Sequence, residues 1–315
     1  MIIIFYPFIL LIFSIIFDVL LGEPYNVIHP VVFTGNTIYK FNKYFRRIKS
    51  KKSGGLIFLI FIIIINVLPV MIILYLLFLI NNIISEIAFI IIYVYFLKST
   101  FSIKSMKKHI NRIIDALNKN DINKARINTS MVVRRNTENM DKYYISSAAI
   151  ETTAEGFVDG YFTPLFFYPF FGIIGSLIIR IINTMDSNIA YKDDKNYEFG
   201  RATAIADTLT NYIPSRITPY IFKISAFVLK YKYKKFKIIN TTDSLNAGYS
   251  IDSMAFILNV RLEKVGEYIV NENGKLPDAN DIRKSLNIYY LSCFISLFIF
   301  VLPLSVIMAF LFIYI

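Results

Sequence analysis

The sequence predicts an all-α, polytopic integral membrane protein with about four or five transmembrane or re-entrant helices, in which cytoplasmic helices and loops form the site. Three observations support this fold class. Hydrophobic residues make up 56% and aromatic residues 16% of the 315-residue chain. Runs of Ile, Leu and Phe are long enough to cross a bilayer. Basic blocks adjoin these runs, as in loops that obey the positive-inside rule.

The charge distribution indicates a membrane surface as partner and no nucleic acid, although the net charge is +12. Residues 22–54 hold seven Lys/Arg and one acid, and residues 217–237 hold six Lys and no acid. The single cysteine, Cys293, excludes a disulfide framework. With only two histidines, His29 and His109, a bound metal would need oxygen ligands, which suits Mg²⁺.

One membrane domain is expected over residues 1–315, and its elements follow in order. The membrane segments are predicted at about 2–21, 55–80, 83–97, 161–182 and 289–313. The first lacks a preceding charge and a cleavage site, so it is a retained helix. Asn81-Asn82 joins the second and third as a tight helical hairpin. The fourth is interrupted by Pro164, Pro169, Gly172 and Gly175, which favours a re-entrant or kinked hairpin.

Two further stretches are polar. Residues 98–150 contain an amphipathic helix, IKSMKKHINRIIDALNKND, which is expected on the cytoplasmic surface and at the lipid interface. Residues 240–285 are soluble in character and rich in loops.

The polar core is predicted in residues 134–160 and 183–216. Glu151, Glu155 and Asp159 recur at i, i+4 and i+8, which places three carboxylates on one helix face. Such a face is either solvated or meets a cation, a metal or a basic substrate. Asn183, Thr184, Asp186 and Ser187 form a second cluster, and Asp207, Asn211 and Arg216 a third. Carboxylates and arginines beside a membrane suggest Mg²⁺-assisted handling of phosphate-bearing molecules.

The sequence lacks the nucleotide-binding and hydrolase motifs that would indicate a different chemistry. It contains no GxxxxGK[ST], no GxGxxG after a strand, no GxSxG and no HExxH. The chemistry must come from carboxylates, arginines and hydroxyls.

These residues carry a resemblance to the CbiB/CobD-type family of cobalamin biosynthesis, the adenosylcobinamide-phosphate synthases. The matching motifs are DxLLGEP at 18–24, HPVxxxG at 29–35, RNT at 135–137, ETTAEGxxDG at 151–160, NTMDS at 183–187, ADTLTNYIPSRIT at 206–218, NAG at 246–248 and VRLEK at 260–264. The chain departs from the family pattern at Asn136, Gly156 and Thr208, where the family usually has Asp, Asn and Asp. These departures affect which residues could bind the metal more than they affect the assignment to the family.

The resemblance implies amide formation between adenosylcobyric acid and 1-amino-2-propanol O-phosphate, or ethanolamine phosphate, with ATP consumed. It implies Mg²⁺ ligands at Glu151, Glu155, Asp159 and Asp186 and phosphate clamps at Arg135, Arg201 and Arg216. Asp207 or His29 would accept the ammonium proton. The further expected substrate contacts are Asn183, Thr184, Ser187, Asn211 and Asn246.

Structural roles remain open for several of these residues. The asparagines could cap helices or close turns, and Arg216 could pair with Asp207. Two other function classes are also open, a Mg-dependent membrane phosphotransferase or prenyltransferase and a small membrane transporter. The implied partners are the corrinoid, the aminoalcohol phosphate, the lipid bilayer and other late cobalamin-pathway enzymes. The expected location is the plasma membrane, with a cytoplasmic active face.

Overall fold

The structure, a computed structural model, describes residues 2–24, 27–80, 82–189 and 197–311. Residues 190–196 of the predicted polar core and 312–313 of the last predicted membrane segment lie outside this range. The chain forms two compact units. Unit 1 comprises Met1–Ser102, Thr163–Thr210 and Phe300–Ile315, and unit 2 comprises Ile103–Phe162 and Asn211–Ile299. The single membrane domain stays a prediction, and each unit is described by itself.

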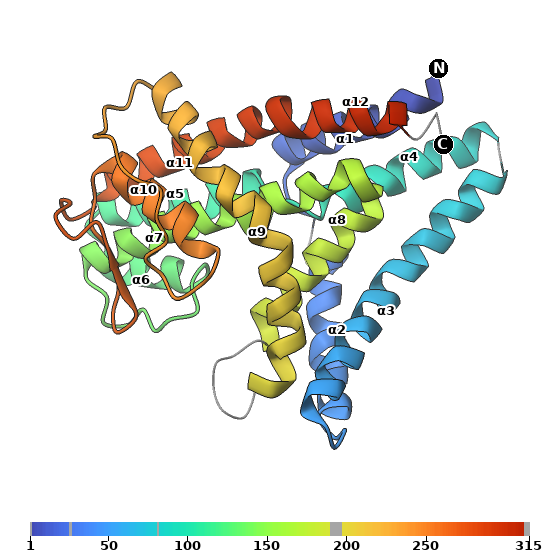
Figure 1. Ribbon diagram of the computed structural model, residues 1–315, viewed down its shortest axis with the longest axis horizontal. Helices are drawn as coiled ribbons and strands as arrows, with labels where there is room; N and C mark the ends of the chain where they lie inside the picture. Colours follow the sequence, from blue (N-terminus) through green and yellow to red (C-terminus); the bar gives the residue numbers. More distant parts are fainter. Residues whose placement is uncertain (1, 25–26, 81, 190–196, 312–315) are drawn as a thin grey trace. The chain divides into compact units, whose positions relative to one another are not determined.

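All regular secondary structure in the described part of unit 1 is helical. It contains α1 (Ile2–Leu21), α2 (Pro30–Phe45), α3 (Lys51–Ile80), α4 (Ile83–Lys98), α8 (Thr163–Ile189), the first part of α9 (Tyr197–Val228) and α12 (Leu302–Leu311). A capping box of Asn82 and Ser85 starts α4 immediately after α3, and the two helices pack together. The predicted helical hairpin is therefore confirmed in the packing of α3 on α4 (Figure 1), and Asn81 of its predicted connection lies outside the described residues.

Among the described residues, three helical stretches are long and apolar enough to cross a membrane by length and composition. They are Lys51–Ile80, Lys142–Ile189 and Ala279–Ala309. They contain or overlap the predicted segments 55–80, 161–182 and 289–313. The segment 83–97 forms only the 16-residue α4, and Pro7–Leu21 is a shorter apolar helix. The all-α membrane class is confirmed.

The broken segment predicted at 161–182 folds back on itself. Gly172 has φ 59° and ψ −154°, which interrupts α8 and divides it into two limbs (Figure 1). The hydroxyl of Ser176 donates to the carbonyl of Pro164 over 2.9 Å. Twelve residues of straight α-helix would span about 18 Å, so this contact requires a reversal of the chain. The kinked hairpin is confirmed in its geometry.

Unit 2 is built around one central helix, α7 (Lys142–Phe157). The surrounding elements are α5 (Lys104–Asn118), α6 (Ile122–Ser130), the second part of α9, α10 (Ala247–Leu258), β1 (Leu262–Lys264), β2 (Tyr268–Val270) and α11 (Ala279–Ser296); η2 (Leu297–Val301) leads into α12. Small residues such as Ala148, Ala149 and Ala154 are fully buried, which lets these neighbours approach α7 closely. A carboxylate on α7 therefore needs a partner inside the protein.

A π-helical turn, η1 (Val158–Phe162), follows α7 and carries Asp159. Glu151 and Glu155 thus lie on α7, whereas Asp159 lies in the π turn that follows it. An aromatic contact accompanies this turn. The rings of Phe157 and Phe162 stack at 5.6 Å with an angle of 21° between them. Residues five apart face different directions on an α-helix but align on a π-helix.

Two other expectations are corrected in unit 2. The amphipathic helix α5 does not offer its apolar face to lipid, because Ile110, Ile113 and Ile114 are buried where α5 packs on α6, α7 and α11. The stretch expected to be loop-rich contains a hairpin in which Leu262 pairs with Val270. Gly266, at φ 79°, supplies the left-handed turn residue of this hairpin.

We predict that Gly172→Ala destabilises the protein by about 1–3 kcal/mol, because the conformation of Gly172 is nearly exclusive to glycine. Gly35→Ala in α2 is the matched control. A Cβ at Gly35 meets nothing within 4 Å, so this variant should be neutral or slightly stabilising. Thermal unfolding in detergent measures both variants. Equal midpoints for the two would contradict the prediction.

Candidate functional site

The first candidate site is an acid–arginine cluster in unit 2, formed by Glu151, Arg135, Ser147 and Tyr268. Glu151 lies in the middle of α7 and is only 4% exposed. Arg135 Nη2 donates to Oε2 of Glu151 over 2.9 Å, and the Tyr268 hydroxyl donates to the same oxygen over 3.0 Å. Ser147 Oγ donates to Oε1 over 2.6 Å. Three residues from three separate stretches of the chain thus satisfy one buried carboxylate.

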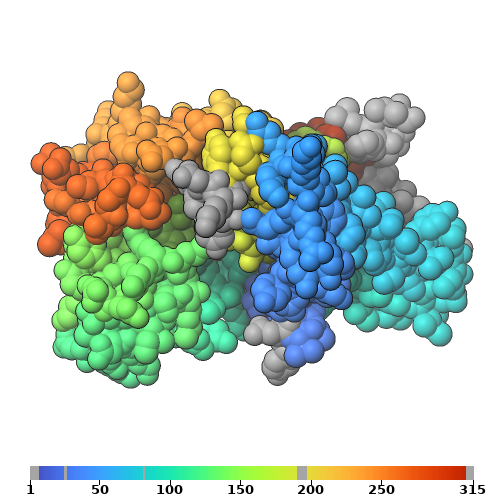
Figure 2. Space-filling view, turned by 90° about the horizontal axis from the view of Figure 1, so that it is seen from below, coloured from blue at the N-terminus to red at the C-terminus, as the bar shows by residue number. Residues whose placement is uncertain are grey.

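The β-hairpin reaches this cluster because Glu263 docks it onto α7. The backbone N–H of Glu263 donates to Ser147 Oγ over 2.8 Å. The carboxylate of Glu263 accepts from the Tyr143 hydroxyl over 3.1 Å and from Arg261 Nη2 over 2.7 Å. In Figure 2 the hairpin region, coloured orange, lies against the surface formed by the green α5–α7 stretch. The VRLEK motif therefore completes the site begun by the RNT and ETTAEG motifs.

Electrostatics fix the protonation state of Tyr268. Burial, and then the negative charges of Glu151 and Glu155, raise the pKa of its phenol far above the ordinary value. The phenol therefore keeps its proton and serves as a hydrogen-bond donor to Glu151.

Two hollows in unit 2 adjoin the cluster and share Arg135 and Asn136. The mixed-charge hollow, of about 360 Å³, is lined by Arg135, Lys264, Glu263 and Glu267 among others. The basic hollow, of about 540 Å³, is lined by Arg126, Arg134 and Arg135 together with Ser130, Thr137 and Glu138. Arg126 is held in place because its Nε donates to the carbonyl of Met140 over 2.8 Å.

Glu155 is coupled electrostatically to the residues of the mixed-charge hollow. It is half-buried on α7, one turn beyond Glu151. The charged groups that act on it are Glu151, Lys264, Arg135 and Glu267. Glu155 therefore lies within electrostatic reach of the two cations of that hollow, Arg135 and Lys264.

The residues present do not form the predicted magnesium site of Glu151, Glu155, Asp159 and Asp186. Both carboxylate oxygens of Glu151 already accept hydrogen bonds. Across the described ranges, no group of three or more His, Cys, Asp or Glu residues is placed to hold a metal ion.

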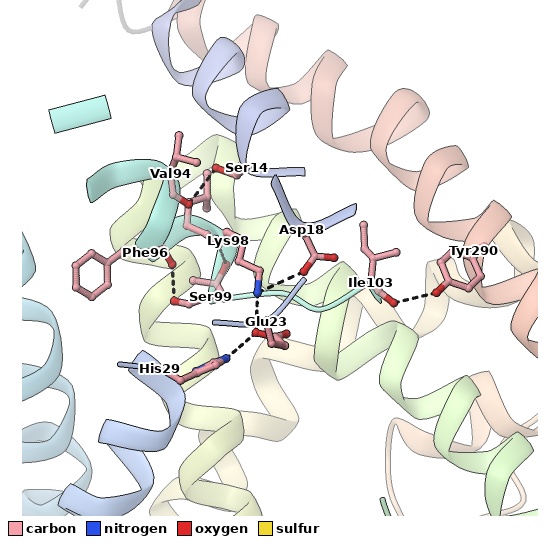
Figure 3. Close-up of polar contacts among 12 residues, drawn as sticks. Ser14, Asp18, Glu23, His29, Val94, Phe96, Lys98, Ser99, Ile103 and Tyr290 are labelled. Atoms are coloured by element: carbon pink, nitrogen blue, oxygen red, sulfur yellow. Dashed lines mark hydrogen bonds and ion pairs between the residues drawn. The ribbon is translucent and has the colours of Figure 1, made fainter. Parts of the chain in front are cut away.

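The second candidate site is a buried lysine cluster in unit 1, formed by Lys98, Asp18, Glu23 and His29 (Figure 3). The ammonium nitrogen of Lys98 lies 2.7 Å from Oε2 of Glu23 and 3.5 Å from Oδ1 of Asp18. The side chains of Lys98 and Asp18 are 0% exposed. Nε2 of His29 lies 2.6 Å from the same Glu23 oxygen. The cluster joins the end of α1, the loop before α2 and the end of α4.

The partners of Glu23 reverse the effect of its burial. Burial alone would raise the pKa of its carboxyl group. The hydrogen bond with His29 and the charge and hydrogen bond of Lys98 outweigh burial and lower the pKa to about 2. Glu23 is therefore a carboxylate at neutral pH.

Both ring nitrogens of His29 are engaged. Nδ1 accepts from the backbone N–H of Val31 over 3.1 Å, which makes His29 the N-cap of α2, and Nε2 donates to Glu23. To accept a substrate proton, His29 would first have to release one of these partners.

Arg216 packs between two tyrosine rings in unit 2. Its Cζ lies 3.4 Å from the ring centroid of Tyr212 and 4.6 Å from that of Tyr249. Its Nη1 donates to Oδ1 of Asn246 over 3.1 Å. This geometry favours a structural role for Arg216 that links α9 to α10.

The predicted site residues are divided between the units. Unit 1 holds His29, Asn183, Thr184, Asp186, Ser187, Arg201 and Asp207, and unit 2 holds Arg135, Glu151, Glu155, Asp159, Asn211, Arg216 and Asn246. The structure brings Arg135 to Glu151 and Arg216 to Asn246. The catalytic and binding roles of all these residues stay predictions.

Sequence reasoning missed Lys98, Ser147, Tyr268 and Lys264. Lys98 resembles an ordinary charge that flanks an apolar segment, and its partner Glu23 is 75 residues away. The VRLEK motif was visible, but its proximity to Glu151 was not. One signal in the sequence could have indicated such partners. Glu151 lies among small residues of a helix, so a buried carboxylate there needs hydrogen-bond donors from other segments of the chain.

Fold and site together define an all-α membrane protein in which polar motifs distant in sequence assemble around a buried carboxylate. Residues 11–289 match the family model described as "CobD/Cbib protein". The chain belongs to this CobD/CbiB family, and its role is in cobalamin biosynthesis.

The relatives support this assignment over nearly the whole chain. A "Probable cobalamin biosynthesis protein CobD" of Thermoplasma volcanium is 46% identical over 304 residues, which cover 96% of this chain and 98% of the relative. That of Thermoplasma acidophilum is 44% identical, covering 96% and 99%. That of Pyrococcus furiosus is 33% identical, covering 88% and 92%. No solved structure matches the chain.

We predict that Arg135→Ala lowers the free energy of unfolding by about 3 kcal/mol, because it leaves the Glu151 carboxylate buried without its cation. Adding Glu151→Gln to this variant should restore most of the loss, since no buried charge then remains. Denaturant unfolding in detergent tests the double-mutant cycle. Simply additive losses would show that the two side chains do not depend on one another.

We predict that Glu23→Gln costs most stability at neutral pH. The folded-state pKa of about 2 lies below the ordinary value of 4.5, so the charged form stabilises the fold above pH 4.5 and this contribution is lost as the pH falls towards 2. The difference from wild type should be about 3 kcal/mol at pH 7 and about half of that at pH 3. Unfolding at both pH values measures it, with the exposed Glu272→Gln as control. A difference that is independent of pH would contradict the assignment.

Proposed function

We propose that the protein is an adenosylcobinamide-phosphate synthase, which joins adenosylcobyric acid to 1-amino-2-propanol O-phosphate, or to ethanolamine phosphate, with ATP. The single observation that carries the proposal is the position of Arg135 between two hollows of different charge in unit 2. Family membership supports the pathway, and the charges of the hollows support the substrates.

The mixed-charge hollow suits a small zwitterion. An aminoalcohol phosphate carries an anionic phosphate and a cationic amine a few bonds apart. Arg135 and Lys264 would bind the phosphate. Glu267, which lines the hollow, and Glu155, which is coupled to it electrostatically, would attract the ammonium group. A polyanion such as ATP fits this hollow less well, because acids line it.

The basic hollow suits the phosphates of ATP. Arg126, Arg134 and Arg135 line it, with a single acid, Glu138. Guanidinium forks bind phosphate oxygens in pairs, and the anchored Arg126 is already held in one orientation. Mg²⁺ would arrive with the nucleotide, so no resident metal site is required.

The reaction balances in two steps. A propionate oxygen of adenosylcobyric acid attacks the terminal phosphorus of ATP, which gives an acyl phosphate and ADP. The free amine then attacks the acyl carbon, the new C–N bond forms, and inorganic phosphate leaves. The ammonium group must first lose a proton, and Asp207 and His29 remain the candidate acceptors. The proposed location is the plasma membrane, with this chemistry on the cytoplasmic side, where other late cobalamin-pathway enzymes are proposed partners.

We predict that purified protein in detergent converts adenosylcobyric acid to the amide adduct only when aminoalcohol phosphate and MgATP are both present. Glu155→Gln should lower the rate by about 100-fold or more, because it removes the carboxyl group that is proposed to attract the ammonium group. Mass spectrometry of the corrinoid follows the product. Glu272→Gln, an exposed change outside the cluster, is the matched control.

Absence of the adduct with either aminoalcohol phosphate would contradict the proposed reaction. Corrinoid binding without turnover would then point to a missing partner protein. Absence of binding as well would favour the membrane phosphotransferase alternative.

A further inference from the structure

The second half of α9 exposes an apolar stripe. Ile213, Tyr220, Ile224 and Phe227 are 55%, 59%, 42% and 79% exposed. At 100° per residue these four positions fall within an arc of about 60° on the helix. A continuous apolar surface of this kind marks a place of contact with a membrane or another molecule.

The opposite side of the same helix is packed inside unit 2. Phe222 is 0% exposed, and its ring lies 5.2 Å from that of Phe157 on α7. Ser225 Oγ and Ser292 Oγ on α11 share a hydrogen bond of 2.7 Å. The exposed stripe therefore has a fixed direction. This part of α9 also carries Arg216 and Lys223, and α9 is not among the helices long and apolar enough to span.

The stripe ends at a lysine strap, defined here as residues 229–240, which has no regular secondary structure (Figure 1). Lys232, Lys234, Lys235 and Lys237 are exposed, whereas the aromatic residues between them are half-buried. Within the described ranges none of these four lysines forms an ion pair, and residues 217–237 contain no acid.

The strap is anchored so that its lysines stay outside. The ring of Phe236 stacks on Phe256 of α10 at 5.2 Å with an angle of 15° between the planes, and Lys223 Nζ lies 4.4 Å from its centroid. Asn287 Nδ2 of α11 donates to the Tyr231 hydroxyl over 3.0 Å. The strap is thus tied to α9, α10 and α11.

From the apolar stripe and the lysine strap we infer that residues 213–237 form an interfacial anchor, which holds unit 2 against an anionic lipid surface. The stripe enters the boundary between headgroups and acyl chains, and the four lysines contact lipid phosphates. A membrane protein offers this partner at close range, and an amphipathic helix followed by a basic segment matches its layered chemistry. The inference does not depend on the proposed reaction.

The test uses the full chain in lipid nanodiscs with a bimane label on Phe227→Cys. The native Cys293 is only 1% exposed, so labelling is selective, and the unmodified chain gives the background. Bromine-bearing lipid should quench the label at position 227. Quenching should be about twofold stronger in discs with phosphatidylglycerol than in phosphatidylcholine discs. Changing Lys232, Lys234, Lys235 and Lys237 to Gln, or raising the salt concentration, should remove this difference.

The matched control is a label at Leu276→Cys, which is 60% exposed in the loop before α11 of the same unit. Quenching at 227 that does not exceed quenching at 276 would overturn the contact of the stripe with lipid. Quenching at 227 that is equal in both lipid mixtures and unchanged by the four glutamines would overturn the role of the lysines.

Discussion

A carboxylate in the middle of a buried helix is the constraint on which unit 2 depends. Glu151 is surrounded by alanines, serines and threonines of α7 that lie against four other helices. A charge in that position is tolerated only if donors reach it from outside the helix. Arg135 arrives from the loop before α7, and Tyr268 arrives from the hairpin. The fold of those two segments is thereby linked to one side chain, and the hollows beside Arg135 exist because that link holds the segments in place.

Unit 1 meets a similar constraint with the opposite sign. Lys98 is an ammonium group without solvent contact, and two acids from the first helix and its following loop neutralise it. His29 connects this ion cluster to the start of α2 by donating to Glu23 and accepting from Val31. The DxLLGEP and HPVxxxG motifs therefore have a structural explanation that is independent of catalysis. The two clusters show that much of the polar sequence of this family member serves the placement of its helices.

The sequence predicted the fold class, the α3–α4 hairpin and the interruption of α8, because apolar length and Pro/Gly positions are local signals. It also selected Glu151 and Arg135 as candidate site residues, and the structure places these two side chains in contact. It did not predict the π turn that carries Asp159, which the stacking of Phe157 on Phe162 accompanies. It assigned α5 to lipid, because an amphipathic pattern does not tell whether protein or membrane covers the apolar face. The pairing of Lys98 with Glu23 depends on contacts between distant segments, which no periodicity records.

The buried lysine has a consequence for biogenesis. Glu23 is synthesised 75 residues before Lys98, so the ion pair that completes this cluster forms only after α4 has been made. The buried ammonium group of Lys98 needs the counter-charges of Asp18 and Glu23. The first helix and its following loop thus act as an internal assembly factor for the end of α4.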